Sequence, residues 1–191
     1  AAESTLRSAL AMGADRGVFI RCDYSPDSMV TARALKAAIE QDGQPDIIFT
    51  GSESIDAEGF QTMFRLGAAL KFPVVSNVVA FKLEDRFVTA ECKMDAGSIE
   101  VIRMPLPCIV GAGKALNQPR YPTLPDIMKA RKKPIRSVAL DSLELDSPAG
   151  GMEIVELRPA VERRHSKIIA GSAEEAVKEL VRLLKAEARV I

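Results

Sequence analysis

Apolar residues recur in two alternating patterns along residues 1–70. Three stretches carry apolar side chains at three- and four-residue steps, as on one face of an amphipathic helix: 4–14, 28–41 and 56–70. Two short apolar runs, 17–22 and 46–50, separate these stretches and are typical of buried strands. Strands that alternate with helices indicate a parallel sheet joined by crossover helices. The pattern therefore predicts an α/β domain.

The periodicity changes after residue 73. Alternating apolar and polar residues over 74–84, 86–94 and 99–104, with polar turns between them, predict an antiparallel meander. The run 107–113 (PCIVGAG) again predicts a buried strand. Because a parallel sheet needs more than three strands to cover its helices, we expect further strands before Ala1.

The C-terminal part has a different character. Residues 139–159 contain the run SPAGG, which favours a linker. Ser172 and Glu175 have the capping-box spacing at the start of a helix that we expect over 172–187. Its apolar stripe consists of Ala176, Val177, Leu180, Val181 and Leu184. Because a lone amphipathic helix is marginal in water, we expect it to pack on a partner or on its own sheet.

Composition and charge limit the classes of partner. Lysine plus arginine equals aspartate plus glutamate at 26 each, and aromatic residues make up only 5% of the chain, so we expect no nucleic-acid partner. No apolar run approaches the roughly 20 residues that span a bilayer, which predicts a soluble protein without membrane insertion. Cys22, Cys92 and Cys108 are odd in number and widely spaced, and His165 is the only histidine. This argues against a disulfide framework and a zinc site.

Four separated segments resemble the beta subunit of electron transfer flavoproteins, in the same order. They are ALAMGADRG at 9–17, TGSESIDAEGFQT at 50–62, KMDAGSIEVIRMPLPCIVG at 93–111 and LNQPRYPTLPDIMKARKKPI at 116–135. The resemblance covers nearly the whole chain, and the last segment is the most specific. Members of this family begin with a strand, a helix and a strand that have no counterpart here, in agreement with the strands expected before Ala1.

The resemblance implies a Rossmann-like fold similar to the adenine nucleotide alpha hydrolases. This fold has a mostly parallel sheet with helices on both faces, an antiparallel extension and a C-terminal arm that ends in a helix. Residues 1–138 would form the nucleotide-binding domain, incomplete at its front, with a partner-recognition loop at 112–134. Residues 139–191 would form the arm that contacts the alpha subunit.

The resemblance also implies a heterodimer, in the bacterial cytoplasm or the mitochondrial matrix. The alpha subunit of such a heterodimer holds most of an FAD, which carries electrons from dehydrogenases, such as acyl-CoA dehydrogenases, to a quinone oxidoreductase or another acceptor. The beta subunit holds a structural AMP. The chain would thus be an electron carrier subunit and not an enzyme, with no catalytic residue and no metal, because the flavin supplies the redox chemistry.

The resemblance places the nucleotide in the segment 51–62. The implied contacts are Gly51, Ser52, Ser54, Ile55, Asp56, Gln61 and Thr62, of which the last two match the phosphate-contacting pair. The segment follows a predicted parallel strand and opens a predicted helix, where unpaired N–H groups favour a phosphate. Gly51 would let the backbone leave the strand sharply, and Asp56 would cap the helix or fasten the loop.

Composition alone also allows a simple polar turn with a capping aspartate at this position. Ser52 and Glu53 stand where members commonly carry a lysine or arginine and a glutamine, and Phe60 replaces a small or amide residue. Glu53, Asp56 and Glu58 would repel a phosphate unless they point away from it. The identity of the nucleotide, AMP or a second FAD, therefore stays open.

The segment 112–134 corresponds to the loop that docks on flavin dehydrogenases. The implied contacts are Arg120, Tyr121, Leu124, Pro125, Ile127, Met128, Lys129 and Lys132. Leu124 matches an apolar anchor, and the neighbouring proline lowers the ordering cost of its insertion. The basic residues would steer acidic partners. The alternatives are a leucine that packs on its own domain and a solvated basic turn.

Two other functions fit the sequence. In the first, the chain belongs to a bifurcating electron transfer flavoprotein, binds a second FAD and takes part in NADH oxidation. In the second, it is a stand-alone adenine-nucleotide sensor, which would bind ATP or AMP without an alpha subunit. Two flavins per heterodimer, against one, distinguish bifurcation from simple carriage.

Overall fold

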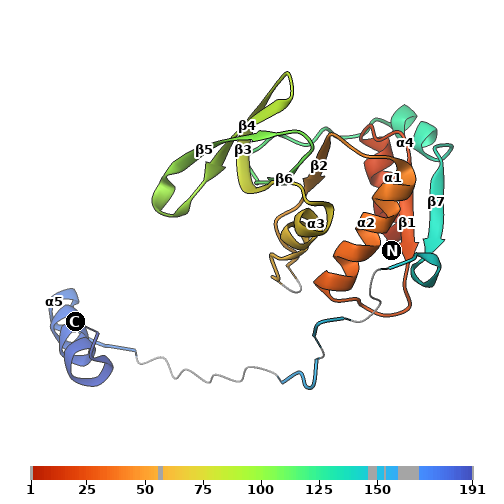
Figure 1. The fold of residues 1–191 in the computed structure, drawn as a ribbon. Coiled ribbons are helices and arrows are strands. Elements are labelled where there is room, and N and C mark those ends of the chain that lie inside the picture. The colour runs from red at the N-terminus through yellow and green to blue at the C-terminus, as the bar shows by residue number, and fades with distance from the viewer. Residues whose placement is uncertain (1, 56–57, 146–149, 153, 159–167, 191) are drawn as a thin grey trace. The chain divides into compact units, whose positions relative to one another are not determined.

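A computed structural model describes residues 2–55, 58–145, 150–152, 154–158 and 168–190 (Figure 1). The chain divides into two compact units, Ala1–Glu153 and Ile154–Ile191. Among its described residues, the first unit contains four α-helices, α1 (Ala2–Ala11), α2 (Ser28–Asp42), α3 (Thr62–Leu70) and α4 (Leu124–Ala130), and two 3-10 turns, Asp95–Gly97 and Leu140–Ser142. Its strands are β1 (Gly17–Arg21), β2 (Ile47–Thr50), β3 (Val74–Glu84), β4 (Phe87–Lys93), β5 (Ile99–Pro105), β6 (Cys108–Ala112) and β7 (Ile135–Ala139).

The strands form two sheets, one of five strands in the order β2-β6-β3-β4-β5 and one of two strands, β1-β7. β2, β6 and β3 run parallel, β3, β4 and β5 form an antiparallel meander, and β7 pairs in parallel with β1. The predicted α/β class, with a mostly parallel arrangement and an antiparallel extension, is confirmed. β7 was not predicted, because its five residues follow a basic, proline-containing segment and pair with a strand far away in sequence.

The two faces of the five-stranded sheet carry separate parts of the core. Ile109 of β6 and its neighbours on one face pack against Met63 and Leu66 of α3 and Ala32 of α2. Figure 1 shows α2 and α3 side by side next to β2. The other face carries a second cluster, formed by Val75, Val78, Val88, Ala90, Cys92, Met104, Cys108 and Val110. This packing fixes the carboxyl ends of the parallel strands relative to α3.

The first unit continues beyond the predicted linker start at residue 139. Leu140–Ser142 forms a 3-10 turn, and Leu140 and Leu143 are buried against Val30 and Ala34 of α2. These two leucines bury more apolar surface than a solvated linker would, so residues 140–143 differ from the extended linker that we expected. Among the described strands, β1 pairs only with β7 and β2 only with β6. The expected strands before Ala1 stay a prediction.

The second unit contains α5 (Ala173–Leu183), which continues into a π-helical turn at Leu184–Ala188. Ser172 and Glu175 form the predicted capping box, and the Ser172 backbone N–H donates to the Glu175 carboxylate at 2.9 Å. Val177, Leu180 and Val181 on the apolar stripe are exposed. The helix is therefore confirmed, and its packing partner stays a prediction.

Candidate functional sites

The carboxyl ends of three parallel strands meet at one edge of the five-stranded sheet. Thr50 at the end of β2 lies beside Gly111 of β6, and Val110 lies beside Val75 of β3. Ligands of open α/β sheets bind beyond this edge. The segment 51–62 therefore starts at the position where such a site is expected.

The loop after β2 is longer than predicted. The pattern predicted a helix from residue 56, but α3 begins at Thr62, and residues 58–61 are not helical. Glu58 and Phe60 have φ angles of 44° and 47°, which are incompatible with a right-handed helix. The apolar spacing was misleading, because Phe60 packs edge-on against Phe64 of α3 without being part of the helix.

The loop presents most of the predicted nucleotide contacts at the surface. Gly51, Ser54 and Gln61 are exposed, Ile55 is 94% exposed, and Ser52 and Thr62 are half-buried. Asp56 lies outside the described residues. Gln61 occupies the N-cap position of α3, and the expected role of Asp56, to cap the helix or to fasten the loop, stays a prediction. The φ of Gly51 is not in the left-handed region, so the predicted sharp exit from the strand does not require glycine.

The N-terminus of α3 has the features of an anion site. The N-cap residue Gln61 makes no side-chain capping hydrogen bond, and its side-chain oxygen instead accepts a hydrogen bond from Arg65 at 2.6 Å. The first turn of α3 contains no acidic residue. The side chain of Gln61 therefore does not occupy the backbone N–H groups of the first turn, and the helix dipole favours negative charge there. Thr62 and Gln61 are the predicted residues closest to these donors.

The charges around the loop are mixed. Glu53 and Glu58 are exposed, so their carboxylates have room to turn toward solvent and away from a phosphate. Arg65, one turn into α3, is held toward the N-cap residue by its bond to Gln61. An anion at the N-terminus of α3 would therefore rely on backbone N–H groups and on Arg65.

The structure adds Gly111 to the predicted site. A Cβ atom at this position would lie 2.7 Å from the Met63 sulfur and 3.1 Å from the Ser76 Cα. Ser76 and Asn77 form a bulge in β3 opposite Gly111, where Asn77 has a φ of 55°. The glycine lets α3, β3 and β6 approach closely at the ligand edge. The sequence signal was the run GAG at 111–113, which we interpreted only as the end of a buried strand.

The predicted partner contacts gather around a short helix, α4. The backbone N–H and the hydroxyl of Thr123 both donate to Asp126, at 3.1 and 2.6 Å, and close a capping box. Both hydrogen bonds hold the pKa of Asp126 below its ordinary value, and the bond from the Thr123 hydroxyl has the larger effect. Pro125 occupies the first turn, where its missing N–H is not needed. The sequence between Tyr121 and Ala130 is thus suited to a stable first helical turn.

The apolar residues of this segment face solvent. Tyr121 is 94% exposed, Leu124 72%, Met128 61% and Ile127 40%. The alternative that Leu124 packs on its own domain is therefore wrong for the described structure. Contiguous exposed apolar side chains are typical of interaction sites.

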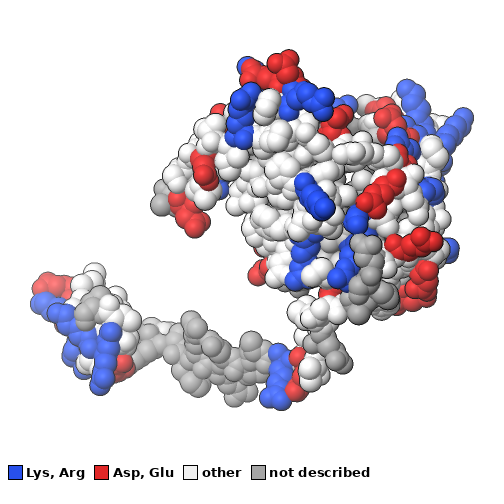
Figure 2. Space-filling view, viewed as in Figure 1, with Lys and Arg blue, Asp and Glu red and all other residues white. Residues whose placement is uncertain are grey.

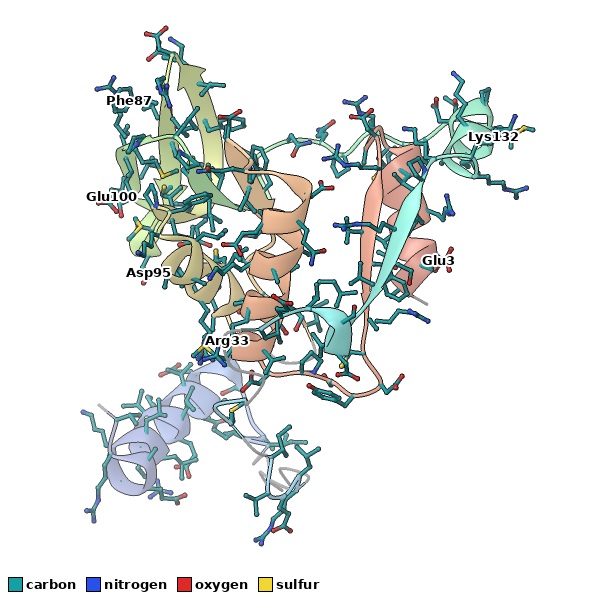
Figure 3. All side chains as sticks on the ribbon, turned by 45° about the vertical axis from the view of Figure 1, so that its right-hand side comes forward. Glu3, Arg33, Phe87, Asp95, Glu100 and Lys132 are labelled. Carbon is teal, nitrogen blue, oxygen red and sulfur yellow. The ribbon has the colours of Figure 1, made fainter. Side chains whose placement is uncertain are left out.

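Exposed basic side chains lie in the same segment as the exposed apolar residues of α4. Arg120, Lys129, Arg131 and Lys132 are exposed, and Figure 2 shows lysine and arginine side chains projecting at the end of the first unit where Figure 1 places α4. In Figure 3 Lys132 lies beside α4, on the side away from the five-stranded sheet. Such a rim of positive charge raises the rate of association with an acidic partner.

Other classes of site find little support among the described residues. They contain no group of three or more potential metal ligands. No helix within the described ranges is long and apolar enough to cross a membrane. Cys22, Cys92 and Cys108 are free cysteines.

The comparisons with known proteins identify the class. Residues 1–143 match the family model of the electron transfer flavoprotein domain. The electron transfer flavoprotein subunit beta of Bacillus subtilis is 37% identical, with 100% of this chain and 75% of the relative covered.

Mitochondrial and animal relatives give the same result. The mitochondrial beta subunit of Oryza sativa subsp. japonica is 38% identical, and the beta subunit of Mus musculus is 33% identical, each with 98% of this chain and 72% of the relative covered. The chain belongs to the family of electron transfer flavoprotein beta subunits.

Proposed function

We propose that this chain pairs with an alpha subunit and helps to pass electrons from flavin dehydrogenases, such as acyl-CoA dehydrogenases, to a quinone oxidoreductase or another acceptor. The alpha subunit holds most of the FAD, which supplies the one- and two-electron chemistry when it is bound. The observation that carries the proposal is the combination of the family match with two separate surface features of the first unit. These are the N-terminus of α3, where the N-cap residue Gln61 makes no side-chain capping hydrogen bond, and the exposed apolar tip of α4.

The nucleotide part of the proposal concerns an AMP whose phosphate lies at the N-terminus of α3. The first-turn N–H groups of α3, with Gln61 and Thr62, would hold the phosphate, and Gly51, Ser52 and Ser54 would line the approach from β2. The fit is supported by the first turn of α3, which has no acidic residue, and by the close approach of backbones at Gly111. Ile55 and Asp56 remain proposed contacts.

Analysis of the nucleotides released from the denatured heterodimer tests this proposal. We expect one AMP and one FAD per heterodimer. Two FAD molecules and no AMP would place the chain among the bifurcating members and would make the complex an NADH-oxidising enzyme. The absence of stoichiometric AMP or FAD from this subunit would reject the nucleotide site. Tight binding of ATP or AMP by the chain without an alpha subunit would instead favour a stand-alone sensor.

The partner part of the proposal concerns the tip of α4. Leu124 would enter an apolar pocket of the dehydrogenase, and Tyr121, Ile127 and Met128 would cover its rim. Arg120, Lys129 and Lys132 would steer an acidic surface toward this tip, with Pro125 restricting the backbone beside the anchor. One buried leucine contributes about 2 kcal/mol, which suits a short-lived encounter better than a permanent complex.

A further inference from the structure

The segment that carries the α4 tip is fastened to α1 by two long basic side chains. Arg7 of α1 donates from Nη1 to the backbone oxygens of Ala130 at 2.9 Å and Lys133 at 2.8 Å. Lys133 donates from Nζ in the opposite direction, to the oxygens of Leu10 at 3.0 Å and Ala14 at 2.6 Å. Arg7 of α1 therefore binds carbonyls at the C-terminal end of α4, and Lys133, which follows α4, binds carbonyls at the C-terminal end of α1.

These contacts satisfy groups that a helix cannot satisfy by itself. The last four carbonyls of a helix have no intrahelical partner, and a cation at the C-terminus also complements the helix dipole. α4 has only seven residues, and helices this short are not stable in water without tertiary contacts. The reciprocal caps of Arg7 and Lys133 thus supply what the local sequence of α4 lacks.

The start of the segment also lies against α1. Gly13 follows α1 with a φ of 124°, and a Cβ added there would lie 3.6 Å from Nη1 of Arg120. Ala130, in the last turn of α4, is buried with Leu10 and Ala11 of α1. The segment is consequently fixed to α1 at its C-terminal end, through Ala130 and Lys133.

The fixed base and the exposed tip belong to the same short helix. Ala130 is 2% exposed, whereas Leu124, at the other end of α4, is 72% exposed. A rigid base lowers the ordering cost that an exposed anchor incurs on binding. The hydrogen bonds described for Arg7 and Lys133 go to backbone oxygens at the ends of α1 and α4 and not to Leu124, so both residues act at a distance from the anchor that a partner would meet.

We infer that Arg7 and Lys133 are positioning residues for partner docking, which hold α4 in the orientation that presents Leu124 to the dehydrogenase. This inference rests on the proposed function of the α4 tip. It assigns to α1 a role in recognition, although α1 lies outside the segment 112–134 that the family resemblance implies. Neither residue touches a reacting group, so neither is a catalytic residue.

Hydrogen–deuterium exchange of the intact heterodimer tests the structural half of the inference without any dehydrogenase. In Arg7→Met and Lys133→Met we expect the amides of Ile127, Arg131 and Lys132 to exchange about tenfold faster, because charge-assisted hydrogen bonds are lost. The amides of β6 should be unchanged. Arg7→Lys should restore slow exchange, since a single nitrogen of Arg7, Nη1, donates to each of the carbonyl oxygens that Arg7 binds.

Two control variants separate other effects of the substitution. Glu3→Gln removes the 3.8 Å ion pair of Arg7 and keeps its backbone contacts, so its α4 exchange should equal that of the wild type. Arg86→Met changes an exposed arginine on the turn between β3 and β4, far from α1 in sequence. Unchanged α4 exchange in Arg7→Met, or an equal increase in Arg86→Met, would overturn the inference.

Electron transfer from an acyl-CoA dehydrogenase, reduced with its acyl-CoA substrate, tests the functional half. We expect Arg7→Met to raise the KM for the heterodimer about three- to tenfold with unchanged kcat and flavin content, and Arg7→Lys to restore the wild-type KM. In the Leu124→Ala background, Arg7→Met should cause no further increase. Additive effects in the double variant, or a loss of kcat with normal KM, would contradict a role through Leu124.

The two proposals fail in different ways. A wild-type heterodimer that accepts no electrons, or a Leu124→Ala variant with normal KM, would reject the proposed docking function of the tip. A normal KM in Arg7→Met together with a raised KM in Leu124→Ala would keep that function and reject the inference about Arg7. The exchange experiment decides whether α1 fastens α4 in either case.

Discussion

Replacement of Gly51 by alanine would test whether the loop after β2 meets a ligand. Apart from Gly51 itself and its two chain neighbours, no heavy atom of the described residues lies within 4 Å of an added Cβ at this position, and the φ of Gly51 is not left-handed. The free energy of unfolding should therefore be unchanged or raised by up to about 1 kcal/mol, because alanine restricts the unfolded chain. A loss of AMP in this variant would then report on the ligand and not on the fold.

Gly111→Ala is the matched variant, for which the structure predicts the opposite result. The added Cβ would lie 2.7 Å from the Met63 sulfur, 3.1 Å from the Ser76 Cα and 3.2 Å from the Val75 carbonyl oxygen. Met63 is 2% exposed, and the other two neighbours are backbone atoms. Overpacking of this kind costs about 1–3 kcal/mol, so we expect the stability to fall by that amount.

The assay combines urea unfolding of each heterodimer, followed by circular dichroism, with measurement of released AMP. We predict that Gly51→Ala keeps wild-type stability and binds AMP at least about tenfold more weakly, because its Cβ occupies ligand space. Gly111→Ala should lose stability first. Full AMP content and unchanged affinity in Gly51→Ala would refute the contact with the nucleotide, and wild-type stability in Gly111→Ala would refute the close approach of β6 and β3.

Three further predictions concern the partner tip, a helix cap and the cysteines. Leu124→Ala should raise the KM for the heterodimer in dehydrogenase assays about 30-fold at unchanged flavin content, since a buried leucine contributes about 2 kcal/mol. Asp27→Ala should lower stability by about 1 kcal/mol at neutral pH. Hydrogen bonds from backbone N–H groups, above all that of Val30, lower the pKa of Asp27 in the folded protein. The contribution of Asp27 to stability is therefore fully present above the ordinary carboxylate pKa and is lost as the pH falls through the lowered pKa. Cys92 and Cys108, whose thiol pKa values are raised by burial, should react with a thiol reagent only after unfolding.

Each of these predictions has a control within the chain. Leu83→Ala on β3 removes another exposed leucine and should leave the KM unchanged. Asp23→Ala, on the same loop as Asp27, should leave the stability at neutral pH unchanged. Cys22 is only half-buried and serves as the internal reference for thiol labelling. Equal effects of Leu83→Ala, a stability loss in Asp27→Ala that persists at low pH, or rapid labelling of Cys92 in the native heterodimer would each contradict the corresponding reasoning.

Local patterns in the sequence were sufficient to predict the elements that are stabilised locally or by simple burial. The apolar face of α2, the alternation over β3 to β5 and the capping box at Ser172 are all present as expected. The loop 58–61 was missed, because no residue-type signal marks positive φ at a glutamate and a phenylalanine. Its apolar spacing imitates a helix.

Long-range contacts were outside the reach of the sequence pattern. β7 pairs with β1 across more than a hundred residues, and the same separation divides Arg7 from the carbonyls that it binds. The resemblance supplied the positions of the proposed nucleotide loop and the proposed partner tip. It did not indicate that Gly111 lies beside the start of this loop or that α1 packs against the base of α4, since both contacts follow from packing in three dimensions.

Anaerobic reduction of the heterodimer by an acyl-CoA dehydrogenase and its acyl-CoA substrate is the most direct test of the proposed electron carriage. The visible absorbance of the bound flavin should decrease at a rate that rises with dehydrogenase concentration and should stay constant when the dehydrogenase is omitted. A flavin that remains oxidised in the presence of the reduced dehydrogenase would contradict the proposal.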